Sequence, residues 1–527
     1  MSISITASAS AAAAPLEHFW SLCVGAGRAN EALRATWLEQ MHRVHTDCGF
    51  RYVRFHGLFH DDMFVYRVED GVTHYNFQYV DEIFDRLLSI GVRPFVEFGF
   101  CPRDLASVTG TVFWWKGHGS PPKNYAAWED LISRTVRHWI DRYGMDEVRS
   151  WYFEVWNEPN LKPFFTGTRS EYFELYKVTA RAVKAVDAQL RVGGPATSNF
   201  VPDARFDGES EDISCHKTVT RAEDLDALDW KPVWLEAFIE FCHRENLPVD
   251  FVSCHPYPTD WPLDEHGVYT GFTRGAGATP ADLCTVRRMV SASAFPQAEI
   301  HLTEWSSSSS PRDHTHDFLQ AATYVVRANL ESIGLVDSLS YWTFTDVFEE
   351  GGAGPTAFHG GFGMINFQGI PKPTFHAYRF MHRLGDLRVA QCPGAVVTRH
   401  TVSGRLTALA YHYPPEMKLS VPASMTDRTG ARRVLAMGKP EDFTLNISGL
   451  KPGACFIVEV LDAAHGDAMS AYLAMGEPNP LSPLQEQYLR EVAAATDRSV
   501  VRADVAGVLN FRRTLQPWSI AIIEQVD

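Results

Sequence analysis

Two glutamates in short motifs are the residues of this chain whose types and setting could do chemistry. Glu158 lies in Trp-Asn-Glu-Pro (156–159), and Glu304 lies in Leu-Thr-Glu-Trp (302–305). Hydrolysis of a glycosidic bond needs two carboxyls that flank the bond: one protonates the leaving oxygen, and the other attacks the anomeric carbon or activates water. A separation of about 5–5.5 Å gives retention and about 6.5–9.5 Å gives inversion, and only a structure supplies that distance.

The elements that must position these glutamates alternate in a regular way. Short apolar runs read as buried parallel strands, and the segments between them, such as 79–91, 126–144 and 318–334, have the three- and four-residue apolar spacing of helices. Eight such repeats predict an α/β fold, a (β/α)8 TIM barrel. A doubly wound open sheet is disfavoured because residues 23–30 contain only a partial glycine-rich phosphate loop. The predicted strands are 18–25, 52–57, 93–100, 150–159, 191–196, 250–257, 298–305 and 337–346.

Polar and aromatic residues gather at the predicted strand ends, where a TIM barrel carries its active site. Glu158 ends the fourth strand and Glu304 the seventh. Any one of these residues alone would most simply be a salt-bridged or solvent-facing strand end. A whole set at one rim is a poor fit to that explanation, because buried carboxyls need partners. The other members are Arg54, Phe55, His56, Glu97, Asn157, His255, Tyr257, Trp305 and Trp342.

The pattern changes after about residue 386. Segments there alternate apolar and polar residues, which predicts an appended C-terminal antiparallel β-sandwich domain with one face of its sheet exposed to water. We expect three parts: residues 1–17 as an N-terminal strand that joins the sandwich, 18–385 as the catalytic barrel, and 386–527 as the sandwich with one helix within 477–497.

Composition narrows the classes of function. The formal charge of −16 argues against binding to nucleic acid or to an anionic membrane face. Nine cysteines without paired spacing suit a reducing compartment, and the N-terminus lacks a basic, apolar leader, so we expect a cytoplasmic protein without a membrane span. No metal site or cofactor is expected. The HxH spacing at 314–316 lies at a helix start, where capping or surface exposure explains it better than metal ligation.

Several motifs, in order along the barrel, resemble glycoside hydrolases of family 39. They are Phe-His-Gly (55–57), Pro-Phe-Val-Glu-Phe-Gly-Phe (94–100), Ser-Pro-Pro-Lys (120–123), Trp-Asn-Glu-Pro (156–159), His-Pro-Tyr (255–257), Thr-Glu-Trp (303–305), Tyr-Trp-Thr-Phe-Thr-Asp-Val-Phe-Glu-Glu (341–350) and Phe-His-Gly-Gly-Phe-Gly (358–363). That family contains β-xylosidases and α-L-iduronidases, and the bacterial β-xylosidase branch fits better. The family's barrel with a β-sandwich agrees with the change near residue 386.

The resemblance implies roles for individual residues. Glu158 becomes the acid/base and Glu304 the nucleophile, and the glycone-binding residues become Arg54, His56, Asn157, His255, Tyr257, Trp342 and Glu349. Alternatives stay open: His255 and Trp342 also suit a packed core, Arg54 also suits an ion pair with a catalytic carboxylate, and Glu350 takes the place of Glu349 if the alignment slips by one.

The resemblance implies a retaining exo-glycosidase that releases xylose from xylo-oligosaccharides. Alternatives are an α-L-arabinosidase or a bifunctional enzyme, an iduronidase-like hydrolase, and a carbohydrate-binding protein on an inactive barrel. One departure concerns Ser306–Ser310, where Ser309 occupies the place of a family tyrosine. Loops 101–124, 201–228 and 258–279, with Phe113, Trp114 and Trp115, are candidates for the pocket wall. The oligomeric state is open.

Overall fold

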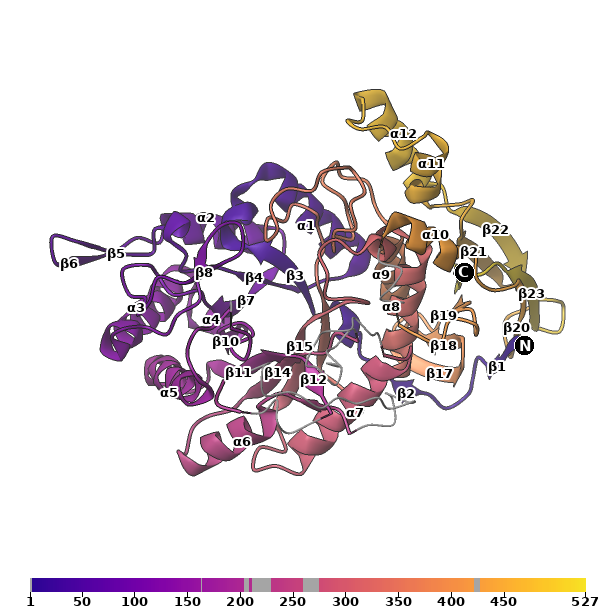
Figure 1. Cartoon of the computed structure of the whole chain (residues 1–527). Helices are drawn as coiled ribbons and strands as arrows, with labels where there is room; N and C mark the ends of the chain where they lie inside the picture. Colours follow the sequence, from indigo (N-terminus) through magenta and orange to yellow (C-terminus); the bar gives the residue numbers. More distant parts are fainter. Residues whose placement is uncertain (1, 163, 203–207, 211–228, 259–273, 421–426) are drawn as a thin grey trace.

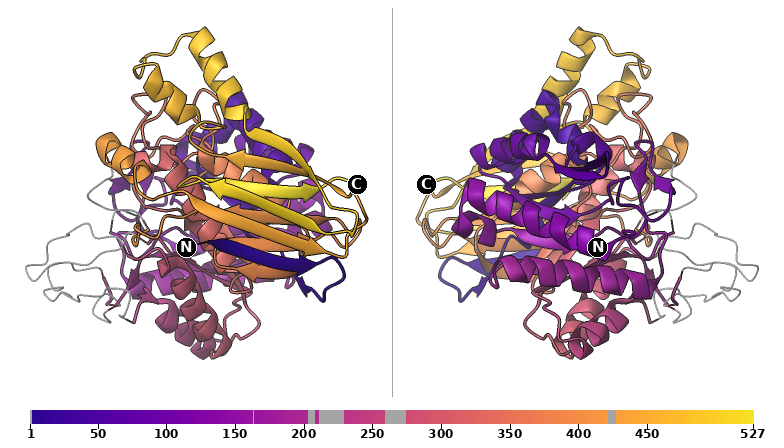
Figure 2. Two further views of the ribbon diagram at one scale, coloured as in Figure 1. Left: turned by 90° about the vertical axis from the view of Figure 1, so that its right-hand side faces the viewer. Right: turned by 90° about the vertical axis from the view of Figure 1, so that its left-hand side faces the viewer.

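The computed structural model describes residues 2–162, 164–202, 208–210, 229–258, 274–420 and 427–527. A ring of helices around a central barrel forms one part of the molecule, and a layered β-structure packs on its side (Figure 1). Both chain termini lie on the β-structure (Figure 2).

Eight parallel strands close into a barrel in simple chain order, which confirms the predicted (β/α)8 fold. All eight predicted runs contain a strand. In the first run the strand starts only at Cys23, because Phe19–Ser21 forms a 3-10 turn (η1). The strands are β3 (Cys23–Arg28), β4 (Tyr52–His56), β7 (Arg93–Phe98), β10 (Tyr152–Val155), β11 (Arg191–Ser198), β14 (Phe251–His255), β15 (Glu299–Trp305) and β16 (Ser338–Tyr341).

Amphipathic helices cover the outside of the barrel. Their ends follow ordinary capping chemistry: the Asn124 side chain accepts from two backbone N–H groups of α3, and Thr168 and Glu171 form a capping box on α5. The helices are α1 (Ala35–Cys48), α2 (Gln78–Ser89), α3 (Tyr125–Tyr143), α4 (Met145–Arg149), α5 (Arg169–Val186), α6 (Leu235–Arg244), α7 (Ala278–Ser291), α8 (Leu319–Glu331) and α9 (Pro373–His382).

The barrel interior changes character along its axis. Aromatic side chains such as Tyr52, Phe95 and Tyr152 pack together in a buried cluster near the N-terminal ends of the strands. Because side chains on a strand repeat their direction every two residues, the next inward positions on β4 and β10 are Arg54 and Glu154. An apolar layer thus supports a charged layer, which lies below the polar strand ends.

Two sheets form the C-terminal β-structure. Seven strands are ordered β2-β17-β18-β19-β24-β21-β22, and three are ordered β1-β20-β23. The N-terminal segment contributes one strand to each sheet: β1 pairs in parallel with β20 of the three-stranded sheet, and β2 pairs with β17 of the seven-stranded sheet. The strands are β1 (Ile3–Ser8), β2 (Ala14–Pro15), β17 (Leu387–Cys392), β18 (Ala395–Arg399), β19 (Leu406–Tyr411), β20 (Glu441–Ser448), β21 (Cys455–Leu461), β22 (Asp497–Arg502), β23 (Leu509–Leu515) and β24 (Ile520–Gln525).

The expectation of one exposed face is wrong for the seven-stranded sheet. Val397 on β18 packs toward the smaller sheet, whereas Val396 and Leu409 pack into the cluster that includes the barrel helices. On that second face the Thr398 hydroxyl donates to the Thr407 carbonyl at 3.1 Å. The central strands β18, β19 and β24 are therefore buried on both faces, whereas the edge strand β22 is largely exposed.

The described residues of the C-terminal part contain three helices where one was predicted. They are α10 (Arg428–Leu435), α11 (Ala468–Ala474) and α12 (Pro483–Ala494), and α11 and α12 project from the body as a hairpin (Figure 1). The predicted helix corresponds to α12.

Short elements complete the described chain. Small hairpins are formed by β5 (Tyr66–Glu69) with β6 (Val72–Tyr75) and by β8 (Thr111–Val112) with β9 (Gly117–His118). β12 (Phe200–Val201) and β13 (Lys231–Pro232) form a further antiparallel pair. The 3-10 turns are η2 (Ala29–Leu33), η3 (Asp61–Met63) and η7 (His314–Asp317). Within the described residues, we find no helix with the length and apolarity needed to cross a bilayer.

Candidate active site

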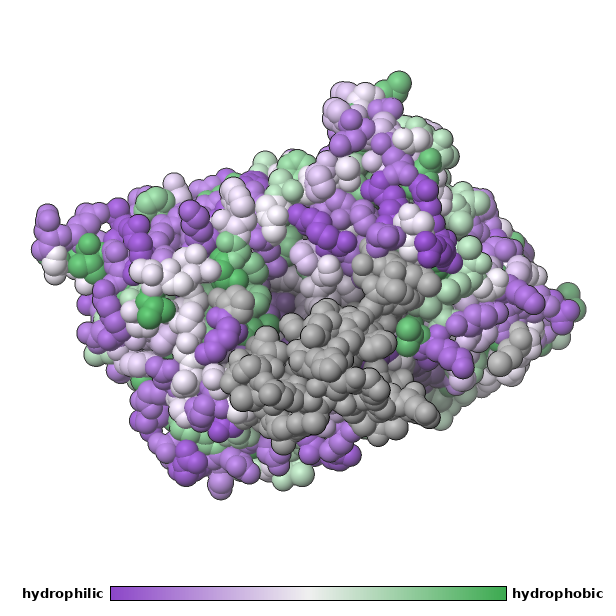
Figure 3. Space-filling model, in the orientation of Figure 1, coloured by the Kyte–Doolittle hydropathy of each residue, from purple (hydrophilic) through white to green (hydrophobic). Residues whose placement is uncertain are grey.

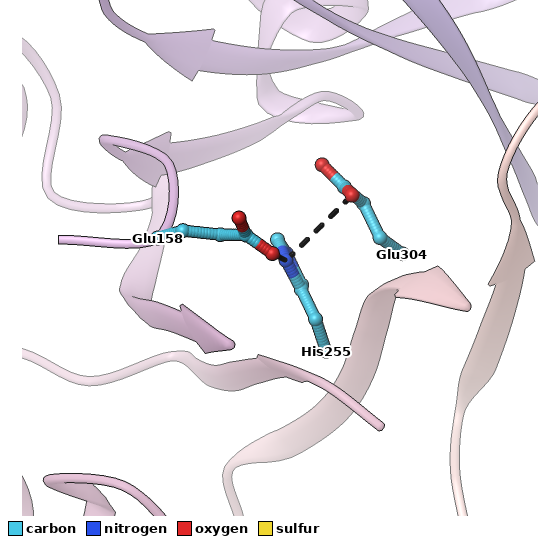
Figure 4. A group of neighbouring side chains, drawn as sticks. All are labelled: Glu158, His255 and Glu304. Atoms are coloured by element: carbon cyan, nitrogen blue, oxygen red, sulfur yellow. Dashed lines mark hydrogen bonds and ion pairs between the residues drawn. The ribbon is translucent and has the colours of Figure 1, made fainter. Parts of the chain in front are cut away.

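Glu158 and Glu304 face each other across the barrel mouth with His255 beside both (Figure 4). His255 Nδ1 is 2.8 Å from Glu158 Oε1 and 3.8 Å from Glu304 Oε2. One oxygen of each carboxyl lies within 4.8 Å of the other. This spacing is close to that of a retaining pair and shorter than the gap of about 6.5 Å or more that an inverting pair needs for its water.

Glu158 reaches this position through a turn and not through the strand itself. We predicted a strand over 150–159, but β10 ends at Val155, and Trp156 and Glu158 both have positive φ, at 73° and 44°. The Glu158 backbone N–H donates to the Ala196 carbonyl at 2.8 Å, which ties the turn to the end of β11. A non-glycine residue in the left-handed region is costly and persists only where its surroundings hold it, as they commonly do at active sites.

Glu304 lies in β15, where a register shift between Leu302 and Trp305 breaks the regular alternation. Such a bulge lets Thr303 and Glu304, although consecutive, both contact groups inside the barrel mouth. The Tyr257 hydroxyl donates to Glu304 Oε2 at 3.0 Å, and Arg54 Nη1 donates to Glu304 Oε1 at 2.8 Å. Both carboxylate oxygens are therefore held in place.

Arg54 is the hub of the charged layer and is fully buried. Its Nε donates to Glu154 Oε2 at 2.5 Å, and its Nη2 lies 2.9 Å from Asn157 Oδ1 and 3.0 Å from Glu97 Oε2. With Glu304 this makes four partners for one guanidinium. A buried charge is stable only when it is paired and hydrogen-bonded, and this planar fork satisfies that condition.

His56 extends this network toward the mouth. Its Nδ1 is 2.6 Å from Glu97 Oε2, and its Nε2 is 3.4 Å from Glu350 Oε1. Burial opposes the charged imidazole, but Glu97, Glu350 and Glu304 outweigh burial and raise the pKa of His56 to about 10. His56 is therefore a cation at neutral pH.

The two central carboxyls differ in their surroundings. Burial raises the pKa of Glu158 to about 7, and a hydrogen bond with Ser198 and the cations His56 and Arg54 only partly oppose it. Burial also raises the pKa of Glu304, while the positive charge of Arg54 acts against that rise. Glu158, without a direct bond to a cation, is the better proton donor, and Glu304, bonded to Arg54, is the better carboxylate.

Asn157 and Trp342 line the same region. The Asn157 oxygen is bonded to Arg54, while its side-chain nitrogen is buried and has no partner among the described residues, so it can donate to a ligand hydroxyl. Trp342 is 2% exposed and packs against His56 with ring centroids 4.8 Å apart. Its ring also fills the space above Gly25, where a β-carbon would lie 2.2 Å from it.

Glu349 does not take the position that the resemblance implied. Its carboxylate is 2.9 Å from Arg28 Nη2 and 2.5 Å from Arg34 Nη2, which satisfies both oxygens away from Glu158 and Glu304. Glu350, the next residue, is the one that reaches His56. The geometry therefore favours the alternative, Glu350, as the glutamate that faces the site, and the role of either residue in sugar binding stays a prediction.

The comparisons with known proteins agree with this geometry. Residues 2–510 match the profile of glycosyl hydrolases family 39. The chain belongs to this family. It is 37% identical to a β-xylosidase of Geobacillus stearothermophilus over 96% of this chain and 92% of that protein. Its structure is similar to those of a family-39 enzyme from Xanthomonas axonopodis pv. citri (TM-score 0.85, 32% identity, 99% and 97% of the two chains) and a monomeric β-xylosidase from Caulobacter crescentus (TM-score 0.84, 33% identity, 99% of each).

Family-39 membership makes this chain a glycoside hydrolase with a carbohydrate substrate. Glu158 follows the fourth barrel strand, three residues after its end, and Glu304 is the penultimate residue of the seventh. Two contacts of this family-39 site, Glu154 and Thr303 below the mouth, were not predicted. Glu97 was noted only as a polar strand end, and Glu350 only as the alternative to Glu349.

One rim of the family-39 site is built by the hairpin β8–β9. Phe113 stacks on His56 at 5.9 Å, Trp115 is 6% exposed, and Trp114 is 64% exposed. The backbone N–H of Trp114 donates to the backbone carbonyl of Glu350 at 2.8 Å, and this bond connects the hairpin to the loop after β16. This face of the molecule is hollowed near its centre (Figure 3).

The remaining predictions for the pocket wall concerned the serine run 306–310 and two long loops. Ser309 is exposed, whereas Ser306, Ser307 and Ser308 are buried. Most of the candidate wall loops 201–228 and 258–279 lies outside the described residues.

Two groups of side chains consist of residue types that can bind a metal ion. Glu158, His255 and Glu304 offer three close ligand atoms, but Arg54 already places a positive charge against Glu304. At 314–316 we expected a helix start with capping or exposed histidines. His316 is instead fully buried in η7, where its Nδ1 is 3.1 Å from the Gly360 carbonyl.

Proposed function

We propose that this chain is an exo-acting β-D-xylosidase that works with retention, with Glu158 as acid/base and Glu304 as nucleophile. The observation that carries the mechanism is the pair of carboxyls within 4.8 Å, one bonded to Arg54 and the other to a neutral histidine. The choice of sugar is supported by the Geobacillus and Caulobacter relatives, whose names state β-xylosidase activity.

The reaction proceeds by two displacements. Glu304 attacks the anomeric carbon while Glu158 gives its proton to the departing oxygen, so that a glycosyl-enzyme forms and the aglycone leaves. Water then attacks the same carbon, Glu158 takes the proton of that water, and Glu304 is released as a carboxylate. Tyr257 and Arg54 hold Glu304 in place in the resting enzyme. Asn157, with its unpaired N–H, is positioned to bind the sugar 2-hydroxyl.

The test is a panel of 4-nitrophenyl glycosides with identification of the first-formed anomer. We expect the β-D-xyloside to be the best substrate and β-xylose to be the first product. A higher kcat/KM for the α-L-arabinoside or the α-L-iduronide would replace the proposed sugar. First formation of α-xylose would contradict the retaining pair.

The pH dependence follows from Glu158. Burial raises the pKa of its carboxyl to about 7, and the acid form is the one that protonates the leaving group. We therefore expect kcat/KM for an unactivated xyloside to decline as the pH rises through about 7, since kcat/KM reports the free enzyme. The measurement is a kcat/KM profile with xylobiose. A flat profile up to pH 9 would contradict the assignment.

Glu350 and Glu349 form a matched pair for mutagenesis. Glu350→Gln removes a carboxylate that faces His56 and the site, so we expect kcat/KM to decrease on the order of 10- to 100-fold, the usual effect of losing a charged hydrogen bond of about 1.5–3 kcal/mol. Glu349→Gln weakens pairs with Arg28 and Arg34 and is expected to change kcat/KM much less. The measurement is kcat/KM of both variants by steady-state kinetics. A larger decrease for Glu349→Gln than for Glu350→Gln would show that Glu349, and not Glu350, acts at the site.

A further inference from the structure

His255 stands at the centre of a chain of hydrogen bonds that leads away from the catalytic carboxyl. Its Nδ1 is 2.8 Å from Glu158 Oε1, and its Nε2 is 3.1 Å from Thr303 Oγ1. The Thr303 hydroxyl donates to Glu154 Oε1 at 2.7 Å. Glu154 is in turn held by Arg54 Nε at 2.5 Å. Glu154, His255 and Thr303 are each at most 1% exposed, so water does not compete for these bonds.

The direction of each bond in this chain is determined by counting hydrogens. A hydroxyl has one hydrogen, and Thr303 gives its own to Glu154, so the Thr303 oxygen can only accept from His255 Nε2. A neutral imidazole has one N–H, which is therefore on Nε2, and Nδ1 is left as an acceptor. The hydrogen between His255 and Glu158 must then come from Glu158.

We propose that Thr303 and Glu154 are positioning residues that set the tautomer of His255 and thereby keep Glu158 protonated in the resting enzyme. The inference rests on the proposed role of Glu158 as acid/base. It adds a reason for that role beyond burial: an ionised Glu158 would face the lone pair of Nδ1 instead of an N–H donor. The same arrangement favours the return of the proton to Glu158 when water attacks the glycosyl-enzyme.

Other charges act on this pair as well. Burial lowers the pKa of His255 to about 4, so the imidazole is neutral in the working range. The groups that also face Glu158 or His255 are Arg54 and His56 on β4, Glu97 on β7, Tyr257 after β14, Glu304 on β15 and Glu350 after β16. A substitution at Thr303 changes none of these charges, so its effect on the pH profile isolates the hydrogen-bond chain.

The experiment compares kcat/KM profiles of the wild type, Thr303→Val and Thr303→Ser on xylobiose. Valine has the shape of threonine without the hydroxyl, so His255 is free to carry its hydrogen on Nδ1 and to donate it to an ionised Glu158. We expect the alkaline limb of Thr303→Val to move to lower pH by roughly 0.5–1 unit, the effect of about one hydrogen bond. Thr303→Ser keeps the hydroxyl and is expected to keep the wild-type limb. An unchanged limb in a folded Thr303→Val enzyme overturns the proposal.

A second measurement is made on the wild-type chain and needs no turnover; a variant serves only to identify the signals. In wild-type enzyme labelled with ¹⁵N-histidine, the nitrogen shifts distinguish the two tautomers, and the signals of His255 are identified by their loss in His255→Asn. We expect hydrogen on Nε2 and none on Nδ1 at pH 6. Hydrogen on Nδ1 overturns the proposal even if Thr303→Val fails to fold. If the wild type cleaves no xyloside, the proposed function fails, whereas the tautomer is still decided.

Discussion

Replacing Glu304 with alanine is expected to lower kcat/KM on aryl β-xylosides by at least about 10⁴-fold, because the variant has no group that can form the glycosyl-enzyme. Arg54 keeps its partners Glu97 and Glu154, so the variant is expected to fold. Azide, which fits the vacated space, should restore turnover by attacking the substrate directly. The product is then α-xylosyl azide, with inverted configuration.

The control for this variant lies on the same strand. Glu299 is at the other end of β15, 40% exposed and bonded to His301, so Glu299→Gln is expected to leave kcat/KM close to wild type. Product analysis by NMR and steady-state kinetics are the measurements. Formation of β-xylosyl azide by Glu304→Ala would show that another residue is the nucleophile.

Replacing Glu158 with alanine is expected to have an effect that depends on the leaving group. General acid catalysis is worth about 10²–10⁴-fold, and we expect a loss of that order on xylobiose, whose leaving group needs a proton. A 2,4-dinitrophenyl leaving group needs none, so formation of the glycosyl-enzyme is expected to stay fast and its hydrolysis to become rate-limiting. Azide should accelerate that step and give β-xylosyl azide.

The opposite anomers from the two variants separate the two roles within one experiment. The alkaline limb of the pH profile should also disappear in Glu158→Ala, since the group that titrates near pH 7 has been removed. Glu158→Gln, which keeps the shape of the side chain, is the matched control: it should lose activity on xylobiose equally but gain little from azide, because the amide occupies the space. Equal losses on both substrates would contradict the acid/base role.

Most of the barrel was predictable because it depends on patterns that repeat. Parallel strands buried on both faces are continuous apolar runs, and each was recognised. The charged layer was also visible in part: Glu154 interrupts the apolar run of β10, two positions after Tyr152, and so must point inward with it. Applying the two-residue period to every strand would have found Glu154. Thr303 was hidden, since only the bulge in β15 brings it beside Glu304.

Errors arose where tertiary contacts override local pattern. The alternation of apolar and polar residues in the C-terminal strands predicted a sheet face exposed to water. Thr398 and Thr407 are instead buried, and the Thr398 hydroxyl donates to the Thr407 carbonyl on the face that packs toward the barrel helices. Helix α10 is short, contains Gly430 and has a weak intrinsic preference for helix, and it is stabilised by packing of Val434 beside Trp518. Glu349 and Glu350 were left as alternatives because a loop has no period from which to read the direction of a side chain.

The pairing of β1 with β20 has a consequence for the order in which the chain is made. Ile3, Ile5 and Ala7 leave the ribosome more than 400 residues before their partners on β20, Phe443 to Ile447. At about 5–20 residues per second, that delay is roughly 20–90 seconds. All strands of the barrel are synthesised within this interval, with the apolar side of β1 still uncovered. Strand β1 is thus made before the barrel but pairs only after it, and until β20 is made it is an unpaired strand of the kind that promotes aggregation.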